Sequence, residues 1–261
     1  MSYISLLKSN LKINIIISLL DGGKKISDIK KGTQTRTTTI LHALKELDQM
    51  ELITKSDGVY KLTSLGMLEA QICKNCCQSF NTLEKYKDFW LTHDISDLPP
   101  TLMANIGTAI ENSTLVQSTD VDLQKVHETF VDLLSSAKNI LGISPIFHPD
   151  YIKAFKKVLS HEGNKIDLIV TSAVLEKIKQ TDNELITKYL PEGNLQIFLN
   201  NNLKFASTVT EKKWALGLFR LSGEYDYSNE LISDGEEHLK WGQQLFNNIL
   251  EKSTKITTTE S

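Results

Sequence analysis

The chain has 261 residues, of which 40% are hydrophobic and 23% are charged. This length and composition allow two globular domains with separate cores and exclude a disordered or fibrous protein. The net charge of −3 argues against binding of nucleic acid over the whole surface, although residues 1–65 alone carry ten Lys and Arg against six Asp and Glu. Contacts with phosphate groups are therefore expected from residues 1–65 only.

Neither a membrane span nor a secreted fold is indicated. The apolar run from Ile13 to Leu20 is interrupted by polar residues and is too short to span a bilayer. The three cysteines are odd in number and lie close together, which does not suit a disulfide framework. We expect a cytoplasmic protein.

Three helices are predicted in the first 50 residues. Apolar residues at three- and four-residue spacing from Leu6 to Leu20 predict the first helix. A short second helix is expected from Ser27 to Gly32, where the glycine ends it. The third helix is predicted to open at Thr33 or the residue after it.

The third predicted helix has an unusual polar side. Its core-facing residues are predicted to be Thr37, Ile40, Leu41, Leu44 and Leu47. The opposite side carries Thr35, Thr38, Thr39 and His42 and is almost uncharged. Threonines are poor helix formers but can hydrogen-bond a base edge or a phosphate, which favours contact with the DNA major groove. The alternative is a polar helix start with capping hydroxyls.

A β-hairpin is predicted directly after this helix. Residues 52–56 and 59–63 flank Asp57-Gly58, a strong signal for a tight turn. A hairpin after a polar-faced helix is typical of a wing that lies near the DNA backbone. The predicted DNA contacts are Thr35, Arg36, Thr38, Thr39, His42, Lys45, Lys55, Ser56 and Lys61. Residues 40–47, 50–53 and 60–66 resemble the arsenic-repressor-like winged helices of bacteria and archaea.

A long helix is predicted from Leu65 to about Leu91, and such a helix after a wing commonly pairs with its copy in a homodimer. Cys73, Cys76 and Cys77 lie within it at helical spacing. Buried thiols in a helix contact are the favoured interpretation, so no metal site is predicted. A thiol or metal sensor made of these three cysteines is the minor alternative.

The remainder of the chain alternates between strands and helices. This rhythm predicts a mixed, mostly parallel sheet with covering helices. Strands are expected at 114–118, 139–144, 165–171, 195–199, 206–210 and 214–220. Helices are expected at 123–137, 151–160, 173–179, 183–189 and 236–250.

The carboxyl ends of parallel strands suggest where an effector would bind. The residues that follow these strands are Ser144, His148, Thr171 and Ser172, with capping of a helix by Ser172 as the alternative. Trp90 and His93 are further candidates, although His93 with Asp94 also suits a role in fixing the linker to the domain.

A second resemblance is narrower. Residues 89–100 resemble the middle-domain signature of an archaeal regulator family associated with methanogenesis genes, and residues 214–221, 223–226 and 241–246 support it. The similarity runs over nearly the whole chain. It implies a transcription regulator with an effector or partner domain and leaves the ligand open.

No enzyme and no cofactor are expected. The common phosphate-loop, hydrolase, zinc-protease and dinucleotide motifs are not present in the sequence. His238-Leu239-Lys240 matches the first half of the phospholipase D motif, but Leu245 stands where an Asp is required.

We therefore expect an α+β multidomain chain. The predicted parts are a winged helix-turn-helix domain (1–65), a connecting and dimerisation helix with linker (66–100), an α/β effector or partner domain (101–252) and a disordered tail (253–261). The predicted function is a homodimeric regulator that binds specific double-stranded DNA under control of a small-molecule effector, without a membrane partner. The alternative is an interaction module for a protein of the transcription machinery.

Overall fold

The computed structural model describes residues 6–256, which form parts of two compact units, Met1–Phe80 and Asn81–Ser261. We refer to them as unit 1 and unit 2. Among the described residues, no helix combines the length and the apolar character needed to cross a membrane.

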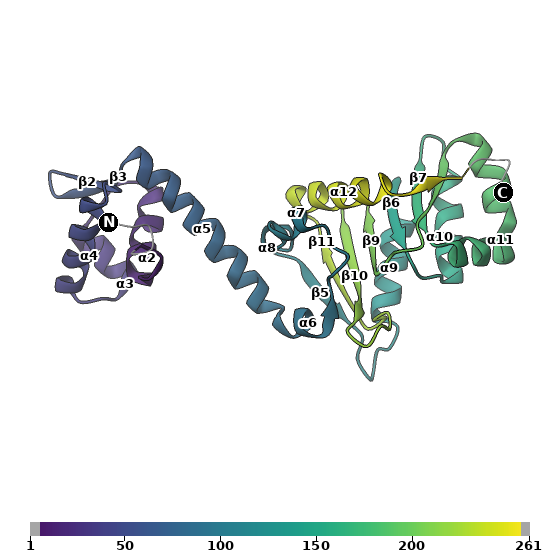
Figure 1. Cartoon of the computed structure of the whole chain (residues 1–261), viewed down its shortest axis with the longest axis horizontal. Helices are drawn as coiled ribbons and strands as arrows, with labels where there is room; N and C mark the ends of the chain where they lie inside the picture. The colour runs from purple at the N-terminus through teal and green to yellow at the C-terminus, as the bar shows by residue number, and fades with distance from the viewer. Residues whose placement is uncertain (1–5, 257–261) are drawn as a thin grey trace. The chain divides into compact units, whose positions relative to one another are not determined.

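The helices of unit 1 begin with α2 (Asn10–Ser18), followed by the 3-10 turn η1 (Leu19–Asp21), α3 (Ile26–Thr33) and α4 (Thr37–Gln49) (Figure 1). The predicted first helix is interrupted at Ser9, whose hydroxyl caps α2 by accepting a hydrogen bond from the Lys12 backbone. Helix α3 continues past Gly32 and ends where Gln34 adopts a left-handed conformation. Helix α4 consequently begins later than predicted.

A three-stranded antiparallel sheet completes unit 1, in the order β1 (Lys24–Lys25), β3 (Val59–Leu62), β2 (Ile53–Ser56). The predicted hairpin is confirmed. Asp57 and Gly58 have φ angles of 51° and 75°, which a tight turn between two strands requires. Strand β1 was not predicted because two lysines give no alternating pattern.

The core of unit 1 lies between the helices and the sheet, and Ile40, Leu44 and Leu47 of α4 are buried in it. Leu41 was predicted to face this core, but its side chain is 44% exposed and Ala43 is buried instead. At 100° per residue, position 43 is nearer to the centre of the buried side.

Helix α5 (Ser64–Lys85) follows the sheet, and α6 (Lys87–Thr92) follows α5. The single helix predicted to Leu91 is therefore two helices, which are separated at Tyr86. The hydroxyl of Tyr86 is buried and donates a hydrogen bond to the carbonyl oxygen of Ser113. This contact holds the break inside the core of unit 2.

Unit 2 contains a nine-stranded mixed sheet in the order β12-β8-β7-β6-β9-β10-β11-β5, with β4 beside β10. Its strands are β4 (His93–Asp94), β5 (Thr114–Gln117), β6 (Asn139–Ser144), β7 (Lys165–Val170), β8 (Leu195–Leu199), β9 (Phe205–Val209), β10 (Trp214–Arg220), β11 (Asn229–Ser233) and β12 (Thr254–Lys255).

The mixed sheet agrees with the prediction, but the expectation that it is mostly parallel is wrong. Over residues 6–256, only β6–β7 and β7–β8 are parallel pairs. Strands β9, β10 and β11 follow one another through short loops, and a short loop can only reverse the chain direction.

Helices cover both faces of this sheet (Figure 1). On one face lie α9 (Lys125–Ser135), α10 (Pro149–Leu159) and α11 (Ser172–Glu192). On the other face lie α12 (Glu236–Leu250), α6 and the short helices α7 (Pro100–Met103) and α8 (Ile106–Ala109). The two helical segments predicted within 173–189 meet at Asp182, which is not helical.

The polar C-terminal segment was predicted to be disordered from residue 253. Thr254 and Lys255 instead form β12, which pairs with β8, and Ile256 is buried. The apolar side chain of Ile256 explains why this segment packs on the sheet. Residues 257–261 of the predicted tail lie outside the described residues.

Candidate functional site

Helix α4 exposes a face of small polar and basic side chains. Thr38, Thr39, His42 and Lys45 are exposed, because the residues between them fill the core of unit 1. Arg36 and Thr35 precede the helix, and the hydroxyl of Thr35 donates a hydrogen bond to the Thr33 carbonyl oxygen. The predicted residues within α4 therefore lie on the exposed side of this helix.

The hairpin adds a second basic element. Lys55, Ser56 and Lys61 are exposed, and the ammonium group of Lys55 lies 5.3 Å from the centre of the Tyr60 ring. The hairpin turn and α4 lie on the same side of unit 1 (Figure 1). This side combines hydroxyl groups on a helix with lysines on the two strands of the hairpin.

An ion pair fixes α4 against α2. The Lys12 side chain is 6% exposed, and its Nζ lies 3.0 Å from Oε2 of Glu46 on α4. The hydrogen bond from Lys12 lowers the pKa of Glu46. One oxygen of Glu46 is thus occupied by Lys12, and the other lies 3.6 Å from Nδ1 of His42 on the exposed face of α4.

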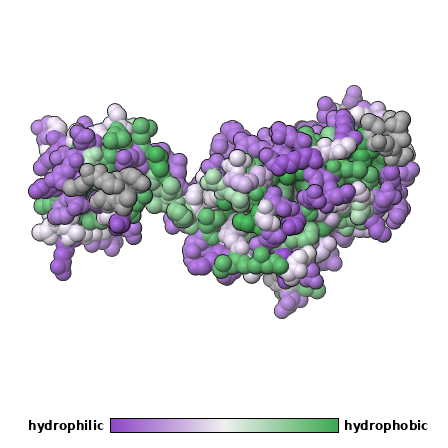
Figure 2. Space-filling model, in the orientation of Figure 1, coloured by the Kyte–Doolittle hydropathy of each residue, from purple (hydrophilic) through white to green (hydrophobic). Residues whose placement is uncertain are grey.

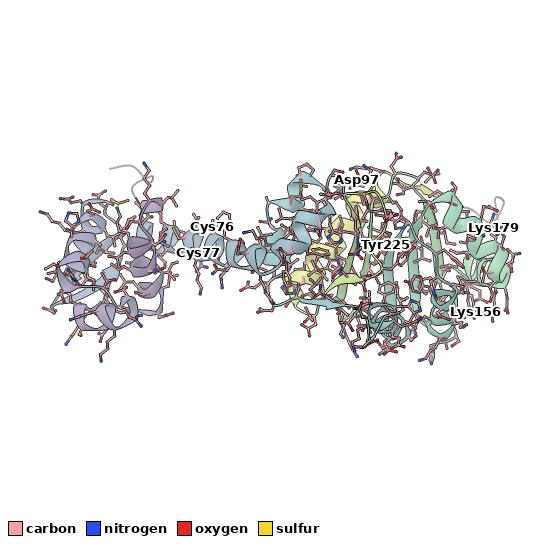
Figure 3. All side chains as sticks on the ribbon, turned by 90° about the horizontal axis from the view of Figure 1, so that it is seen from below. Cys76, Cys77, Asp97, Lys156, Lys179 and Tyr225 are labelled. Atoms are coloured by element: carbon pink, nitrogen blue, oxygen red, sulfur yellow. The ribbon has the colours of Figure 1, made fainter. Side chains whose placement is uncertain are left out.

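The cysteines lie on α5, where Figure 3 shows Cys76 and Cys77. Cys73 is buried in the core of unit 1, and burial raises the pKa of its thiol. Over residues 6–256, these three residues do not form a group whose possible ligand atoms lie within 4.8 Å of one another. Cys76 is exposed and Cys77 is half-buried, so the prediction of buried thiols is correct for Cys73 and wrong for the other two.

The same helix carries exposed apolar side chains on one side. Leu65, Leu68, Ile72 and Phe80 are between 49% and 69% exposed. Figure 2 shows hydrophobic atoms gathered over the start of this helix. Apolar side chains in such a row are typical of a surface that packs on another protein chain.

Two of the predicted effector residues, Thr171 and Ser172, lie at the start of helix α11. The hydroxyl of Thr171 accepts a hydrogen bond from the Val174 backbone at 3.2 Å, so Thr171 rather than Ser172 is the cap of α11. The Ser172 backbone N–H donates to Oδ1 of Asn201. Both groups are occupied by internal partners.

His93 is buried in a network around Asp226. Its Nε2 lies 2.9 Å from Oδ2 of Asp226, and its Nδ1 lies 2.6 Å from the Phe89 carbonyl oxygen. Asp226 also accepts hydrogen bonds from the Arg220 guanidinium and the Asn229 amide. Burial alone would raise the pKa of Asp226, but these hydrogen bonds lower it. The partner of His93 is therefore Asp226 and not the neighbouring Asp94.

Trp90 lies close to this network. Its indole N–H is buried and has no hydrogen-bond partner in the described part of the chain, and its ring meets the Phe89 ring edge-on at 5.0 Å. His93 lines a cavity of about 490 Å³ together with Gln117 and Asn229, and Trp90 does not. Neither residue lines the cavity described next.

Ser144 and His148 line a cavity of about 220 Å³ between the sheet and helices α9 and α10. Its floor consists of small residues, Gly142 on β6 and Ala206 and Thr208 on β9. Gly142 and Thr208 are directly paired in the sheet. The space in front of Gly142 is occupied by Leu168 of the neighbouring strand β7, whose Cδ2 would lie 2.8 Å from a Cβ at position 142.

Aromatic rings form the walls of this cavity. Tyr151 packs edge-on against Phe130 at 5.2 Å, and Tyr225 packs edge-on against Tyr227 at 4.9 Å. Tyr225 is labelled in Figure 3 beside the sheet of unit 2. Its ring rests on Gly217 of β10, where a Cβ would lie 2.9 Å from Cζ of Tyr225.

A carboxyl group also lines the cavity. Glu230 on β11 is only 5% exposed, and within residues 6–256 its Oε2 has no hydrogen-bond partner. Burial raises its pKa to about 8. A buried acceptor without a partner is costly, which makes Glu230 a candidate for contact with a ligand.

Two histidines and an aspartate lie beside the cavity. Nε2 of His127 lies 3.2 Å from Oδ2 of Asp150, and the rings of His127 and His148 are 3.9 Å apart. Burial and the neighbouring His127 lower the pKa of His148. Possible ligand atoms of these three residues lie within 4.8 Å of one another, which is close enough to share a metal ion.

Most of the cavity residues were not singled out from the sequence. Gly142 and Gly217 interrupt apolar strand patterns, and a glycine inside a strand often marks the close approach of a ligand or another group. Glu230 precedes the apolar pair Leu231-Ile232, so its burial follows from strand alternation with Ile232. His127 and Asp150 gave no signal, because they come from separate helices.

Two family models match the chain. The model described as "Methanogenesis regulatory protein FilR1, middle domain" matches residues 123–252, and the N-terminal domain model of the same protein matches residues 3–79. The methanogenesis regulatory protein FilR1 of Methanothrix harundinacea (strain 6Ac) is 31% identical over 255 residues. This alignment covers 95% of the chain, which spans 56% of the length of that relative.

Solved structures with partial similarity include TrmBL2, described as an archaeal chromatin protein with a novel mode of DNA binding. It is 16% identical, with a TM-score of 0.43 and coverage of 97% of this chain and 98% of that one. NucT from Helicobacter pylori is 19% identical, with a TM-score of 0.44 and coverage of 56% of this chain and 99% of that one.

Proposed function

Because the chain belongs to the family of the methanogenesis regulatory protein FilR1, we propose that it is a transcription regulator that binds double-stranded DNA through unit 1. The observation that carries this proposal is the exposed face of α4, where hydroxyl and basic groups stand next to a basic hairpin. Three helices followed by this hairpin support assignment of residues 1–65 as a winged helix-turn-helix domain.

In this proposal α4 enters the major groove. Thr38, Thr39 and His42 are placed to read base edges, because they lie at the centre of the exposed face. Arg36, Lys45 and the hairpin lysines would contact phosphate groups, as would the hydroxyls of Thr35 and Ser56. Loss of a base-reading residue should therefore change the preference for DNA sequence, whereas loss of a phosphate-contacting residue should change the salt dependence of binding.

We also propose a homodimer that forms through α5. The exposed apolar side chains on one side of this helix would be covered by the same helix of a second copy. Two copies of α4 would then meet two half-sites of an operator, which is the symmetry that dimeric regulators use.

Unit 2 is proposed to sense a small-molecule effector in the cavity lined by Ser144 and His148. Asp226 lies between Tyr225 and Tyr227 in the sequence, and both tyrosines line the cavity. Asp226 also forms a hydrogen bond with His93, the residue that directly follows α6. A ligand that moves the tyrosines would therefore act on the segment that follows α5 and α6. A tenfold change in DNA affinity needs only about 1.4 kcal/mol of such coupling.

A catalytic role has less support. His238 is buried on α12 and contacts the Ser233 hydroxyl, so the His238-Leu239-Lys240 segment is part of a packed helix. The second candidate function is an interaction module, which the exposed apolar residues of α5 would serve if they bound a protein of the transcription machinery.

The test is a fluorescence-anisotropy titration of the full chain against DNA from upstream of its own gene. Unrelated DNA serves as competitor, and the titration is repeated over a salt series. Specific and salt-dependent binding with two chains per site supports the regulator. Equal binding to all DNA, or no binding with and without candidate effectors, would contradict it and favour the interaction module.

A further inference from the structure

We propose that the cavity of unit 2 binds a small organic cation, whose ammonium group sits against the carboxylate of Glu230 and whose apolar part lies among the aromatic walls. This inference rests on the proposed function, because it names the chemistry of the effector for the same cavity. It can nevertheless be tested without DNA.

The first argument is the unpartnered carboxyl oxygen. Glu230 is almost fully buried, and its Oε2 faces no hydrogen-bond donor among the described residues. Leaving such a group unpaired is unfavourable, whereas an ammonium group would supply both a donor and a compensating charge. The ligand that Glu230 favours most is therefore a cation with N–H groups.

The second argument is the aromatic lining. Phe130, Tyr151, Tyr225 and Tyr227 all line the cavity, and they pack edge-on in the pairs Tyr151–Phe130 and Tyr225–Tyr227. Ring faces carry negative electrostatic potential and attract cations, most strongly where water is excluded. A buried carboxylate among several aromatic rings is an arrangement that binds substituted ammonium groups.

The third argument is the charge of the remaining lining. No Lys or Arg is found among the described residues that line the cavity, so an anionic ligand would meet no fixed positive charge. A purely apolar ligand would fill the space but leave Oε2 of Glu230 unpaired. Asp150, beside the lining residues His127 and His148, is paired with the Lys153 ammonium group at 2.7 Å, so Glu230 is the acidic residue of the lining that is left for a cation.

The size of the cavity limits the ligand. A volume of about 220 Å³ is at or below the small end of typical ligand pockets. The ring of Phe155 and the side chains of Leu134 and Leu168 are available to its apolar part. We expect a compact amine with a short alkyl or single-ring substituent.

The experiment is isothermal titration calorimetry of the full chain with three chloride salts: cyclohexylammonium, butylammonium and 2-phenylethylammonium. The neutral counterparts are cyclohexanol, butan-1-ol and 2-phenylethanol. At least one ammonium compound should bind with a Kd below about 1 mM, and its neutral counterpart should bind at least tenfold more weakly. Absence of binding by all three ammonium compounds, or equal binding of the alcohols, would overturn the proposal.

Variants locate the bound group. Glu230→Gln keeps the shape of the side chain and should weaken ammonium binding at least tenfold, whereas Glu128→Gln on the exposed side of α9 should leave it unchanged. Unchanged binding by Glu230→Gln would also overturn the proposal. Thermal unfolding of each variant verifies that it is folded.

Two further outcomes separate this inference from its alternatives. Binding of Zn²⁺ that requires His127 and His148, without binding of any ammonium compound, would assign the site to a metal ion. Ammonium binding by a chain that binds no DNA would leave this inference standing and remove the proposed regulator. DNA binding without ammonium binding would overturn this inference and leave the proposed regulator standing.

Discussion

The ring of Tyr225 rests on the backbone of Gly217, in the space that a side chain at position 217 would occupy. This contact sets the position of one wall of the cavity in unit 2. It also explains why β10, which is otherwise apolar and buried, contains a glycine at its centre.

Gly217→Ala should displace Tyr225 and weaken ammonium binding. The added methyl group meets the Tyr225 ring in a packed environment, so we also expect a loss of about 1 to 3 kcal/mol in the free energy of unfolding. Urea unfolding and calorimetry measure the two effects. Gly32→Ala on α3 is the control, because nothing lies within 4 Å of its added Cβ. Full ammonium affinity in Gly217→Ala would show that Tyr225 is not a wall of the binding site.

Glu230 should make the stability of unit 2 depend on pH. Its pKa is about 8 in the folded chain, well above its ordinary value, so the neutral form is favoured by folding. Its contribution to stability is therefore fully present below about pH 4 and is lost as the pH rises toward 8, by at most about 1.4 kcal/mol per pH unit. The titratable groups around it are Tyr151, Tyr225, Tyr227, His127 and His148.

The measurement is urea unfolding between pH 5.5 and 8.5, followed by tryptophan fluorescence. All three tryptophans lie in unit 2, so the signal reports on that unit. The downward slope should be shallower in Glu230→Gln than in the unmodified chain. Ammonium affinity should rise with pH up to about 8, because the cation displaces the proton. Identical slopes in both chains would contradict a raised pKa of Glu230.

Removing the hydroxyls of α4 should affect DNA sequence recognition. Thr38→Ala combined with Thr39→Ala is expected to weaken specific binding by about 1 to 3 kcal/mol and to leave non-specific binding nearly unchanged. Lys55→Ala should weaken both specific and non-specific DNA binding. It should also reduce by about one the slope of the logarithm of the binding constant against the logarithm of the salt concentration. Lys74→Ala on α5 is the control for loss of charge. Equal loss on all DNA from the threonine and lysine variants would remove α4 as the recognition helix.

A charge on the exposed side of α5 should dissociate the proposed homodimer. Ile72→Asp places a carboxylate in the apolar row and should yield monomers, while Gln71→Asp on another exposed side of the helix should not. Light scattering coupled to size exclusion measures the mass. A monomeric unmodified chain, or a dimer that survives Ile72→Asp, would exclude this interface.

Asp226→Asn should destabilise unit 2 by about 2 kcal/mol, because Arg220 and the buried His93 lose their charged partner. The pKa of Asp226 is lowered, so its contribution is present above about pH 4 and disappears as the pH falls below that value. Urea unfolding at pH 7 and pH 3.5 measures both effects. Asp120→Asn, at an exposed position, should change neither.

The sequence by itself determined the local structure and the family. The predicted bounds of β6, β8, β10 and α12 agree with the structure, and the hairpin lies where Asp57-Gly58 places it. The resemblance to methanogenesis regulators is confirmed by the family models. These features depend on turn residues and on periodicity along a short segment, which are properties of neighbouring residues.

Only the tertiary structure decided which distant residues meet. His93 pairs with Asp226, 133 positions away, and not with Asp94 beside it. The sheet is largely antiparallel, although alternating helices and strands suggested the opposite. Likewise, Glu230 becomes a candidate ligand contact only because the fold brings it into the lining of a cavity with residues from distant strands and helices. Strand order and side-chain contacts depend on packing over the whole unit, and periodicity in a local segment carries no record of them.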